Sequence, residues 1–246
     1  MLIKNIEYEI VEHCNLRCKN CNKFSYIKEH NCIDIDQIKK DFFLLSKRFT
    51  LENFTILGGE PLLHPDLNSI ILLAKKAFNN SAIKIITNGT LFFKKNFIFL
   101  NLLSAKNITL EISKYELNID YEKIKNICKK FNINFILTEK QYFKDFVDKS
   151  GSCDPDKSFK RCRELVYCPS FFNGKLFQCG YSKSSEFLTK TSRLSNFALD
   201  KGIDISSTDE QIYKYLTAPV PTCKFCSVDA EFHPWRQLSS QEIKNI

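Results

Sequence analysis

The chain has 246 residues and lacks any long, uninterrupted apolar stretch. Because no run of 18 apolar residues occurs, the sequence predicts no membrane-spanning helix and no membrane partner. The first seven residues also lack the apolar centre of a secretory signal. Eleven cysteines without a secretion signal therefore predict metal-binding thiols in a reducing cytoplasm, and not disulfides.

A basic stripe with interleaved aromatic residues is missing as well. Lys and Arg number 36 against 28 Asp and Glu, but the lysines are spread along the whole chain. This pattern does not favour nucleic acid as a partner. The net charge of +8 instead suits a small anionic molecule, such as a nucleotide or a phosphorylated sugar.

Three cysteines stand close together near the start, at Cys14, Cys18 and Cys21. They follow an alternating segment, Ile6–Ile10, that is typical of a strand. Three thiolates on one short loop can hold three irons of a [4Fe–4S] cluster and leave the fourth iron open. A zinc loop and three buried thiols are the alternatives, although zinc loops usually pair two C-x2-C motifs.

A second motif, Gly58-Gly59-Glu60-Pro61, ends an apolar strand. Glycines permit a close approach of the backbone to a ligand, and a carboxylate can accept hydrogen bonds from an ammonium group. An ordinary strand-to-helix turn led by the proline is the alternative.

Two further strands end in polar residues, one at Thr87-Asn88 and one at Ser113. Taken singly, these positions suit a turn or a helix cap. Together with the cysteine loop and the Gly-Gly-Glu-Pro motif, they resemble the radical S-adenosylmethionine (radical SAM) superfamily. The position before the third cysteine, which is often aromatic in that family, is Asn20 here.

The resemblance implies a [4Fe–4S] cluster on the three cysteines of the loop and SAM bound at its open iron. It also implies that SAM contacts the strand ends, with the amino group near the Gly-Gly-Glu-Pro motif. The SAM-binding residues expected on this basis are Gly58, Gly59, Glu60, Pro61, Thr87, Asn88 and Ser113.

Apolar positions at helical spacing alternate with strands as far as about residue 140. The predicted helices are Ile35–Phe49, Leu67–Phe78, Lys94–Leu103 and Tyr121–Phe131. This alternation predicts an α/β fold with a parallel sheet and outer helices. The family resemblance selects a partial (β/α)6 barrel of TIM type over residues 1–149, with its active site at the C-terminal strand ends.

The composition changes after Lys149, where Gly, Pro and Cys become frequent. Residues 171–178 predict a hairpin that turns at Asn-Gly and would bring Cys162 and Cys179 together. Cys223 and Cys226 would complete four thiolates. The order C-x11-G-x4-C resembles a twitch/SPASM domain and implies a second [4Fe–4S] cluster within residues 150–246. Structural zinc is the alternative.

Cys168 is a fifth candidate in this region. It could replace Cys162 as a ligand, or act as a catalytic hydrogen donor near the active site. Cys128 lies on an apolar helix face and is predicted to be core. His64, in a Leu-His-Pro-Asp run, is predicted to be a turn residue.

From end to end the chain resembles twitch-type radical SAM enzymes, including an aminocyclitol dehydrogenase and proteins encoded beside bacterial polysaccharide genes. The resemblance implies an oxidoreductase of carbohydrate biosynthesis that cleaves SAM and oxidises a carbinol of a sugar, aminocyclitol or nucleotide-sugar. A flavodoxin or ferredoxin would supply electrons. An epimerase that uses Cys168 is one alternative. A peptide-modifying enzyme is another, disfavoured because a loop that begins at Cys14 leaves no room for an N-terminal peptide-recognition domain.

Overall fold

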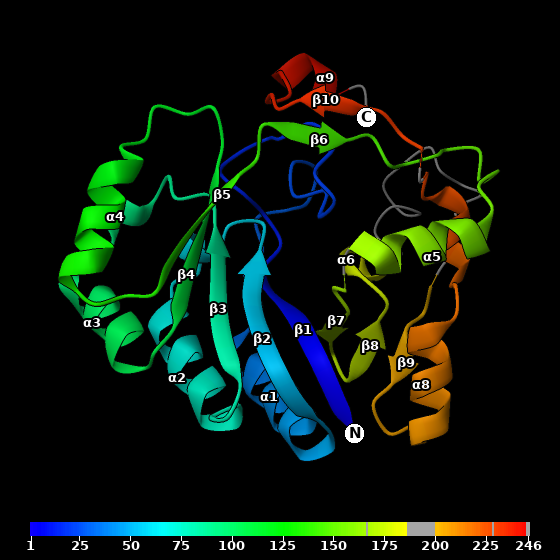
Figure 1. Ribbon diagram of the computed structural model, residues 1–246, viewed down its shortest axis with the longest axis horizontal. Helices are drawn as coiled ribbons and strands as arrows, with labels where there is room; N and C mark the ends of the chain where they lie inside the picture. The colour runs from blue at the N-terminus through cyan, green and yellow to red at the C-terminus, as the bar shows by residue number, and fades with distance from the viewer. Residues whose placement is uncertain (166, 186–199, 228, 245–246) are drawn as a thin grey trace. The chain divides into compact units, whose positions relative to one another are not determined.

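The computed structural model describes residues 1–165, 167–185, 200–227 and 229–244 (Figure 1). It contains two compact units: unit 1 is Met1–Asn15 with Lys28–Gln141, and unit 2 is Leu16–Ile27 with Tyr142–Ile246. This division differs from the predicted one at residue 149. The difference arises because part of the cysteine loop hydrogen-bonds to the C-terminal part of the chain, for example from Lys19 N–H to Arg236 O at 3.0 Å.

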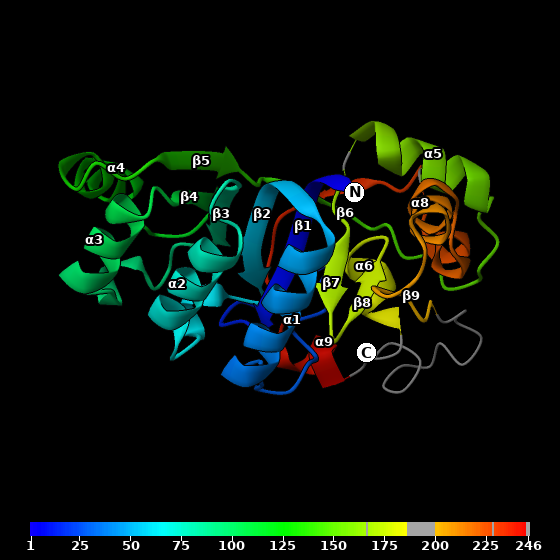
Figure 2. The same cartoon turned by 90° about the horizontal axis from the view of Figure 1, so that it is seen from below.

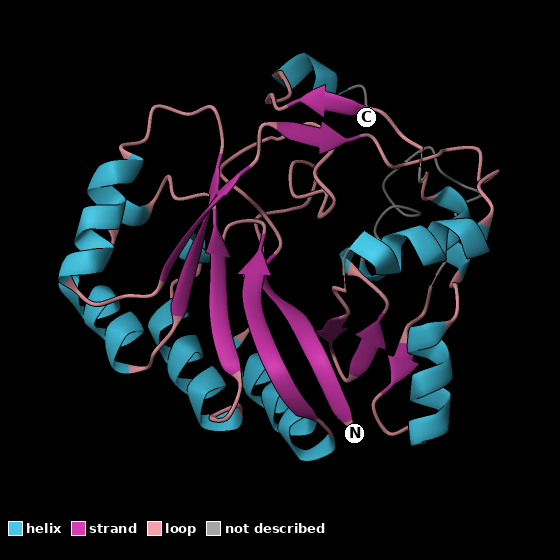
Figure 3. Ribbon diagram, in the orientation of Figure 1, coloured by secondary structure: helices cyan, strands magenta, loops and turns pink. Residues whose placement is uncertain are grey.

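Strands and helices alternate along unit 1 (Figure 3). Its parallel strands are β1 (Leu2–Val11), β2 (Thr50–Gly58), β3 (Ala82–Thr87), β4 (Thr109–Lys114) and β5 (Phe135–Glu139), in the order β5-β4-β3-β2-β1. The connections contain α1 (Ile35–Arg48), α2 (Leu67–Ala77), α3 (Phe97–Ala105) and α4 (Tyr121–Lys130), and the 3-10 turns η1 (Pro61–Leu63) and η2 (Phe92–Lys94). The predicted α/β fold with a parallel sheet is confirmed.

Helices α1, α2 and α3 lie on one face of this sheet (Figure 2). Aromatic side chains fill the layer between α1 and the sheet: the Phe42 ring lies 5.1 Å, centroid to centroid, from the rings of both Tyr8 and Phe54. The Tyr8 hydroxyl donates to Asp41 Oδ2 at 2.8 Å. These contacts hold β1 in place, so the cysteine loop leaves the sheet from a fixed strand.

The sixth strand does not extend the parallel sheet of unit 1. Strand β6 (Tyr142–Lys144) belongs to unit 2 and pairs antiparallel with β10 (Phe232–Pro234) in a separate two-stranded sheet. Unit 1 therefore contains five of the six parallel strands of the expected partial barrel and the four helices that connect them.

Unit 2 is rich in short elements. They are α5 (Pro155–Leu165), β7 (Ser170–Phe172), β8 (Lys175–Phe177), α6 (Gly180–Lys183), β9 (Ile203–Asp204), α8 (Asp209–Thr217), η3 (Pro221–Phe225) and α9 (Ser240–Lys244). Asn173 and Gly174 join β7 to β8 with φ values of 48° and 74°, as the predicted Asn-Gly hairpin requires. Among the helices described in either unit, none is long and apolar enough to cross a membrane.

Candidate cluster and SAM site

The predicted site residues of unit 1 lie along one edge of its sheet. Because the five strands run parallel, their C-terminal ends share that edge (Figure 1). Strand β1 ends just before Cys14, β2 runs into Gly58, and β3 ends at Thr87. Ser113 is buried near the end of β4, in register with Thr138 of β5. The structure thus brings together the residues of unit 1 that the sequence motifs single out.

Gly58 and Gly59 let two backbone segments touch. Gly59 N–H donates to Val11 O at 2.7 Å, and Glu60 N–H donates to His13 O at 3.1 Å. A Cβ atom on Gly59 would lie 1.9 Å from the His13 carbonyl oxygen, and one on Gly58 would lie 2.4 Å from Val11 O. These glycines therefore allow the backbone after β2 to contact the end of β1 and the residues just after it. This contact fixes the start of the cysteine loop.

The Glu60 side chain is fully buried and accepts three hydrogen bonds. Oε1 accepts from Leu62 N–H at 2.9 Å and from the Thr87 hydroxyl at 2.6 Å, and Oε2 accepts from Asn88 N–H at 2.8 Å. Burial raises the pKa of Glu60, while these hydrogen bonds and the charge of Lys95 oppose the rise. The carboxylate therefore joins the turn after β2 to the turn after β3.

Pro61 and His64 shape the turn that follows Glu60. Pro61 is buried at the first position of η1, where its missing N–H costs no hydrogen bond. The His64 ring accepts from Asp66 N–H at 3.0 Å and its other nitrogen contacts Ile33 O at 3.0 Å. One ring nitrogen is thus used within the turn, and the other contacts the chain just before α1, in agreement with the structural role predicted for this histidine.

Asn88 links the turn after β3 to the cysteine loop. Its Nδ2 donates to Asn15 Oδ1 at 2.9 Å and to Cys14 Sγ at 3.6 Å. Its Oδ1 accepts from the N–H and the hydroxyl of Thr90, at 3.0 and 2.6 Å, and Asn15 Nδ2 donates to the same hydroxyl at 2.7 Å. The motifs did not single out Asn15 or Thr90. Their only indication in the sequence is that they stand close to Cys14 and Asn88.

Cys18 and Cys21 belong to unit 2. Cys21 N–H donates to Cys18 O at 3.3 Å, and Asn20 between them has a φ of 62°. Burial raises the pKa of the Cys18 thiol to about 11, although a hydrogen bond from Trp235 opposes the shift. The Trp235 Nε1 atom lies 3.1 Å from Cys18 Sγ. No sequence motif indicated this tryptophan.

Four cysteines of unit 2 line a single cavity: Cys162, Cys179, Cys223 and Cys226. They come from α5, from the N-terminal cap of α6 and from η3 with its C-terminal cap. Burial raises the pKa of the Cys179 thiol to about 11 and that of Cys226 to about 12. The predicted set is therefore gathered in one place, although no three His, Cys, Asp or Glu side chains in the described ranges are grouped to hold a single metal ion.

Arg163 brings a positive charge to the same cavity, on a half-buried side chain. Its Nη2 donates to Gln178 O at 3.1 Å, and its guanidinium lies over the rings of Phe159 and Tyr167, at 5.0 and 5.5 Å. Its Nε and Nη1 atoms are buried without a hydrogen-bond partner in the part of the chain that the structure describes. No sequence motif indicates this residue, since an arginine on a helix is usually solvated.

The remaining cysteines lie outside this set. Cys168 is half-buried between α5 and β7 and is not among the residues that line the four-cysteine cavity. Cys128 is fully buried on α4, as predicted for a core residue. None of the eleven cysteines, all within the described residues, forms a disulfide.

A cavity of about 350 Å³ lies at the ends of β4 and β5, on the same edge of the sheet as Cys14. Charged, amide and aromatic side chains line it, among them Lys114, Tyr121, Glu139 and Gln141. Lys114 Nζ pairs with Glu139 Oε1 at 2.8 Å and lies 5.9 Å from the centre of the Tyr121 ring. The cavity offers both signs of charge and an aromatic surface to a polar ligand.

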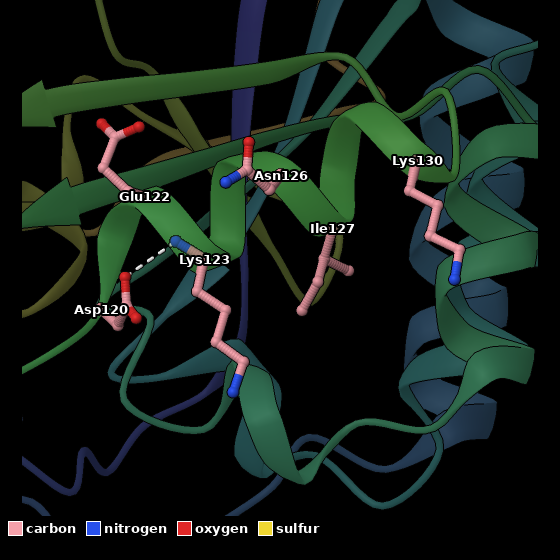
Figure 4. Close-up of a pocket in the computed structure, with 6 residues that line it drawn as sticks. All are labelled: Asp120, Glu122, Lys123, Asn126, Ile127 and Lys130. Atoms are coloured by element: carbon pink, nitrogen blue, oxygen red, sulfur yellow. Dashed lines mark hydrogen bonds between the residues drawn. The ribbon is translucent and has the colours of Figure 1, made fainter.

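A hollow of about 390 Å³ along α4 has a different character (Figure 4). Its lining comes entirely from α4 and the residue before it: Asp120, Glu122, Lys123, Asn126, Ile127 and Lys130. Asp120 caps the helix by accepting from Lys123 N–H at 2.8 Å. Since Ile124 and Cys128 on α4 are buried, the hollow is the solvated side of an amphipathic helix.

Comparison with curated proteins finds partial matches. The chain is 33% identical over 101 residues to the antilisterial bacteriocin subtilosin biosynthesis protein AlbA of Bacillus subtilis (strain 168), covering 41% of this chain and 22% of that protein. It is 31% identical over 113 residues to an S-adenosylmethionine-dependent nucleotide dehydratase of Selenomonas ruminantium, covering 46% and 39%. The chain thus spans less than half the length of these relatives.

Comparison with solved structures finds a likeness over nearly the whole chain. The crystal structure of BtrN in complex with AdoMet and 2-DOIA matches with a TM-score of 0.59 and 16% identity, covering 93% of this chain and 94% of that one. At this identity the likeness shows a shared fold. A family model described as the radical SAM superfamily matches residues 8–137, which are 130 of the 246 residues. The chain belongs to the radical SAM superfamily.

Proposed function

We propose that this chain cleaves SAM reductively and removes a hydrogen atom from a small carbohydrate-like substrate, oxidising a carbinol to a ketone. The substrate class is a sugar, an aminocyclitol or a nucleotide-sugar. The observation that carries the oxidation is the single cavity lined by Cys162, Cys179, Cys223 and Cys226. A cluster held there would accept the electron that a two-electron oxidation leaves on the substrate.

The cysteine loop fits a [4Fe–4S] cluster because donors are already directed at its sulfurs. Asn88 Nδ2 lies 3.6 Å from Cys14 Sγ, and Trp235 Nε1 lies 3.1 Å from Cys18 Sγ. Thiolates that bind iron carry negative charge and accept such hydrogen bonds. Cys21, three residues after Cys18, would supply the third ligand.

The four-cysteine cavity fits an anionic metal–thiolate group. Two buried nitrogen atoms of Arg163, Nε and Nη1, have no acceptor among the described residues, and a buried unsatisfied donor is costly. Thiolate ligands would supply both the acceptors and the compensating charge. We assign Cys162 to this set and leave out Cys168, because Cys162 lines the cavity with the other three.

When bound, the loop cluster and SAM supply a 5′-deoxyadenosyl radical, and the second cluster supplies an electron acceptor. The chain's own part begins with Glu60. A carboxylate can accept about four hydrogen bonds, and Glu60 accepts three from the protein. Its remaining acceptor position suits the ammonium group of SAM. Asn88, Asn15 and Thr90 hold the turn beside it.

The cavity at the ends of β4 and β5 suits the proposed substrate. Its volume of about 350 Å³ falls in the range of small-molecule sites. Lys114, Glu139 and Gln141 can bond hydroxyl or amino groups, and Tyr121 offers a ring face. The likeness to BtrN with bound 2-DOIA and to a nucleotide dehydratase also favours a small polar substrate. Oxidation of a carbinol would release a hydrogen atom from its C–H bond, a proton from its O–H group and one electron, and a cluster held by the four cysteines would supply the acceptor for that electron.

Anaerobic incubation with SAM and dithionite tests the proposal. We expect 5′-deoxyadenosine to form, and a suitable substrate to yield a product lighter by two hydrogens in mass spectrometry. Cys14→Ala should abolish both. Glu139→Gln should raise the KM for the substrate, whereas Glu122→Gln on the solvated side of α4 should leave it unchanged. Absence of 5′-deoxyadenosine with a fully loaded protein would reject the proposal.

An epimerase is the alternative within the same family, and Cys168 distinguishes the two. If its thiol returns a hydrogen atom, Cys168→Ala should keep all iron and still form 5′-deoxyadenosine, but give no inverted product. Solvent deuterium at a product carbon without a change in oxidation state would favour epimerisation. We favour oxidation because a cluster held in the four-cysteine cavity would give the electron an exit.

A further inference from the structure

The segment after β10 lies against the cysteine loop within unit 2. Lys19 N–H donates to Arg236 O at 3.0 Å, and Leu238 N–H donates to Arg17 O at 2.7 Å. Arg17 N–H donates to the side chain of Gln237 at 3.3 Å. The two segments therefore form a short antiparallel bridge, with Cys18 opposite Gln237.

Trp235 stands at the start of this bridge. Its side chain is 9% exposed, and its Nε1–H donates to Cys18 Sγ at 3.1 Å. Indole nitrogen is a donor only, and a buried indole usually finds an acceptor. Here the acceptor is a sulfur that we assign to the loop cluster. Trp235 is also the single tryptophan of the chain.

Contacts on either side fix the position of Trp235. Before it, β10 pairs with β6, where His233 stands opposite Phe143. After it, Arg236 forms an ion pair with Glu242 at 2.6 Å. The Glu242 carboxylate also accepts from Ser239 N–H at 2.9 Å, so it caps α9. The indole is therefore held by a segment whose position is fixed on both sides, by strand pairing before it and by an ion pair and a helix cap after it.

We propose that Trp235 is a positioning residue of the loop cluster, which orients Cys18 and raises the cluster's reduction potential. The proposal rests on the function proposed above, because it requires a cluster on Cys14, Cys18 and Cys21. Reduction adds negative charge to the cluster and its sulfurs, so a donated N–H stabilises the reduced form more than the oxidised form. Burial strengthens that effect, since the local dielectric is low.

The test is Trp235→Phe in the fully loaded protein, which keeps an aromatic ring but removes the N–H donor together with part of the buried ring volume. Redox titration followed by electron paramagnetic resonance should show a lower midpoint potential for the cluster signal that SAM alters. We expect the one-electron equilibrium constant to fall about threefold to tenfold, where tenfold corresponds to about 59 mV. Gln237→Ala is the matched control. It removes a side-chain contact of the same segment but keeps the indole donor, so the potential should not move.

The fluorescence of the single tryptophan provides a second readout. Loading iron into the wild-type protein should quench it, and alkylation of Cys18 in the metal-free protein should be faster in Trp235→Phe than in Gln237→Ala. An unchanged potential with full iron content would overturn the role of Trp235 and leave the proposed function standing. Failure of the wild-type protein to assemble a cluster that responds to SAM would overturn both.

Discussion

The buried Glu60 carboxylate accepts hydrogen bonds from the turn after β2, through Leu62, and from the end of β3, through Thr87 and Asn88. In Glu60→Gln the amide NH2 would face Asn88 N–H, and the charge would be lost. Hydrogen bonds to charged groups contribute about 1.5–3 kcal/mol, and 1.4 kcal/mol is a factor of ten in affinity. We expect the affinity for SAM, measured by equilibrium dialysis, to fall at least tenfold while iron content stays constant.

Thr87→Val is the control for this change. It removes one hydrogen bond to Glu60 but keeps the negative charge. If the charge binds the ammonium of SAM, this variant should lose less affinity than Glu60→Gln. Equal losses in the two variants would mean that Glu60 acts only by holding the turn.

Gly59 is constrained in a different way, because the backbone just after the neighbouring strand β1 leaves no space for a side chain. A methyl group there would meet the His13 carbonyl oxygen. We expect Gly59→Ala to lower the free energy of unfolding by roughly 3 kcal/mol or more, as for other overpacked backbone contacts. Urea unfolding measures this, and Thr50→Ala at the exposed start of β2, the strand before Gly59, should have little effect. A normal midpoint for Gly59→Ala would show that the loop can shift.

The residues that could be predicted from sequence are those in short, local motifs. Cys14 and Glu60 stand in such motifs, and the structure places both at the sheet edge. Trp235 and Arg163 could not be predicted, because the first contacts a sulfur 217 residues away and the second depends on how α5 lies against η3. Their importance comes from tertiary contacts that no local pattern encodes.

At the scale of secondary structure, the ends of the helices depend on capping residues. The spacing of apolar residues does not reveal these caps. Helix α3 starts at Phe97 and not at Lys94, because Asn96 caps it by accepting from Phe99 N–H at 3.2 Å. The preceding residues form η2. Strand β6 could not be assigned from its sequence, since its pairing depends on β10, about ninety residues later. By contrast, the alternating βα pattern was sufficient to predict the parallel sheet.

The packing contact between β1 and α1 gives a prediction about these two elements. Tyr8→Phe would remove a donor from the buried Asp41 carboxylate, while keeping the ring that contacts Phe42. We expect the free energy of unfolding to fall by about 1.5–3 kcal/mol. Tyr213→Phe, at a 64% exposed position on α8, should change it by less than about 0.5 kcal/mol. Equal urea midpoints for Tyr8→Phe and the wild type would contradict this role.

For the molecule as a whole, metal content is the decisive measurement. Seven cysteines in two sets predict two [4Fe–4S] clusters, or about eight irons per chain. Replacing Cys14, Cys18 and Cys21 with Ala should leave about four irons and abolish SAM cleavage. Stoichiometric zinc in anaerobically purified protein would contradict the second cluster, while leaving the loop cluster to be judged by its own spectrum.

The metal-free protein should also respond to alkaline pH. Burial raises the pKa of Cys179 to about 11 and of Cys226 to about 12, from an ordinary value of 9.0. The folded state therefore binds these protons more tightly than the unfolded state. This contribution to stability is fully present below pH 9 and is lost as pH rises towards 11 or 12. We expect urea midpoints to fall over that range, and to fall less in Cys226→Ser.

The bridge between residues 17–19 and residues 236–238 also has a consequence for synthesis. At about 5–20 residues per second, a ribosome needs roughly 10–40 seconds to travel the 217 residues from Cys18 to Trp235. During that interval the loop emerges without the strand partner and the indole that later cover it. We therefore expect stable iron insertion to follow translation of the segment that contains Trp235, even though the three cysteines of the loop are made well before it.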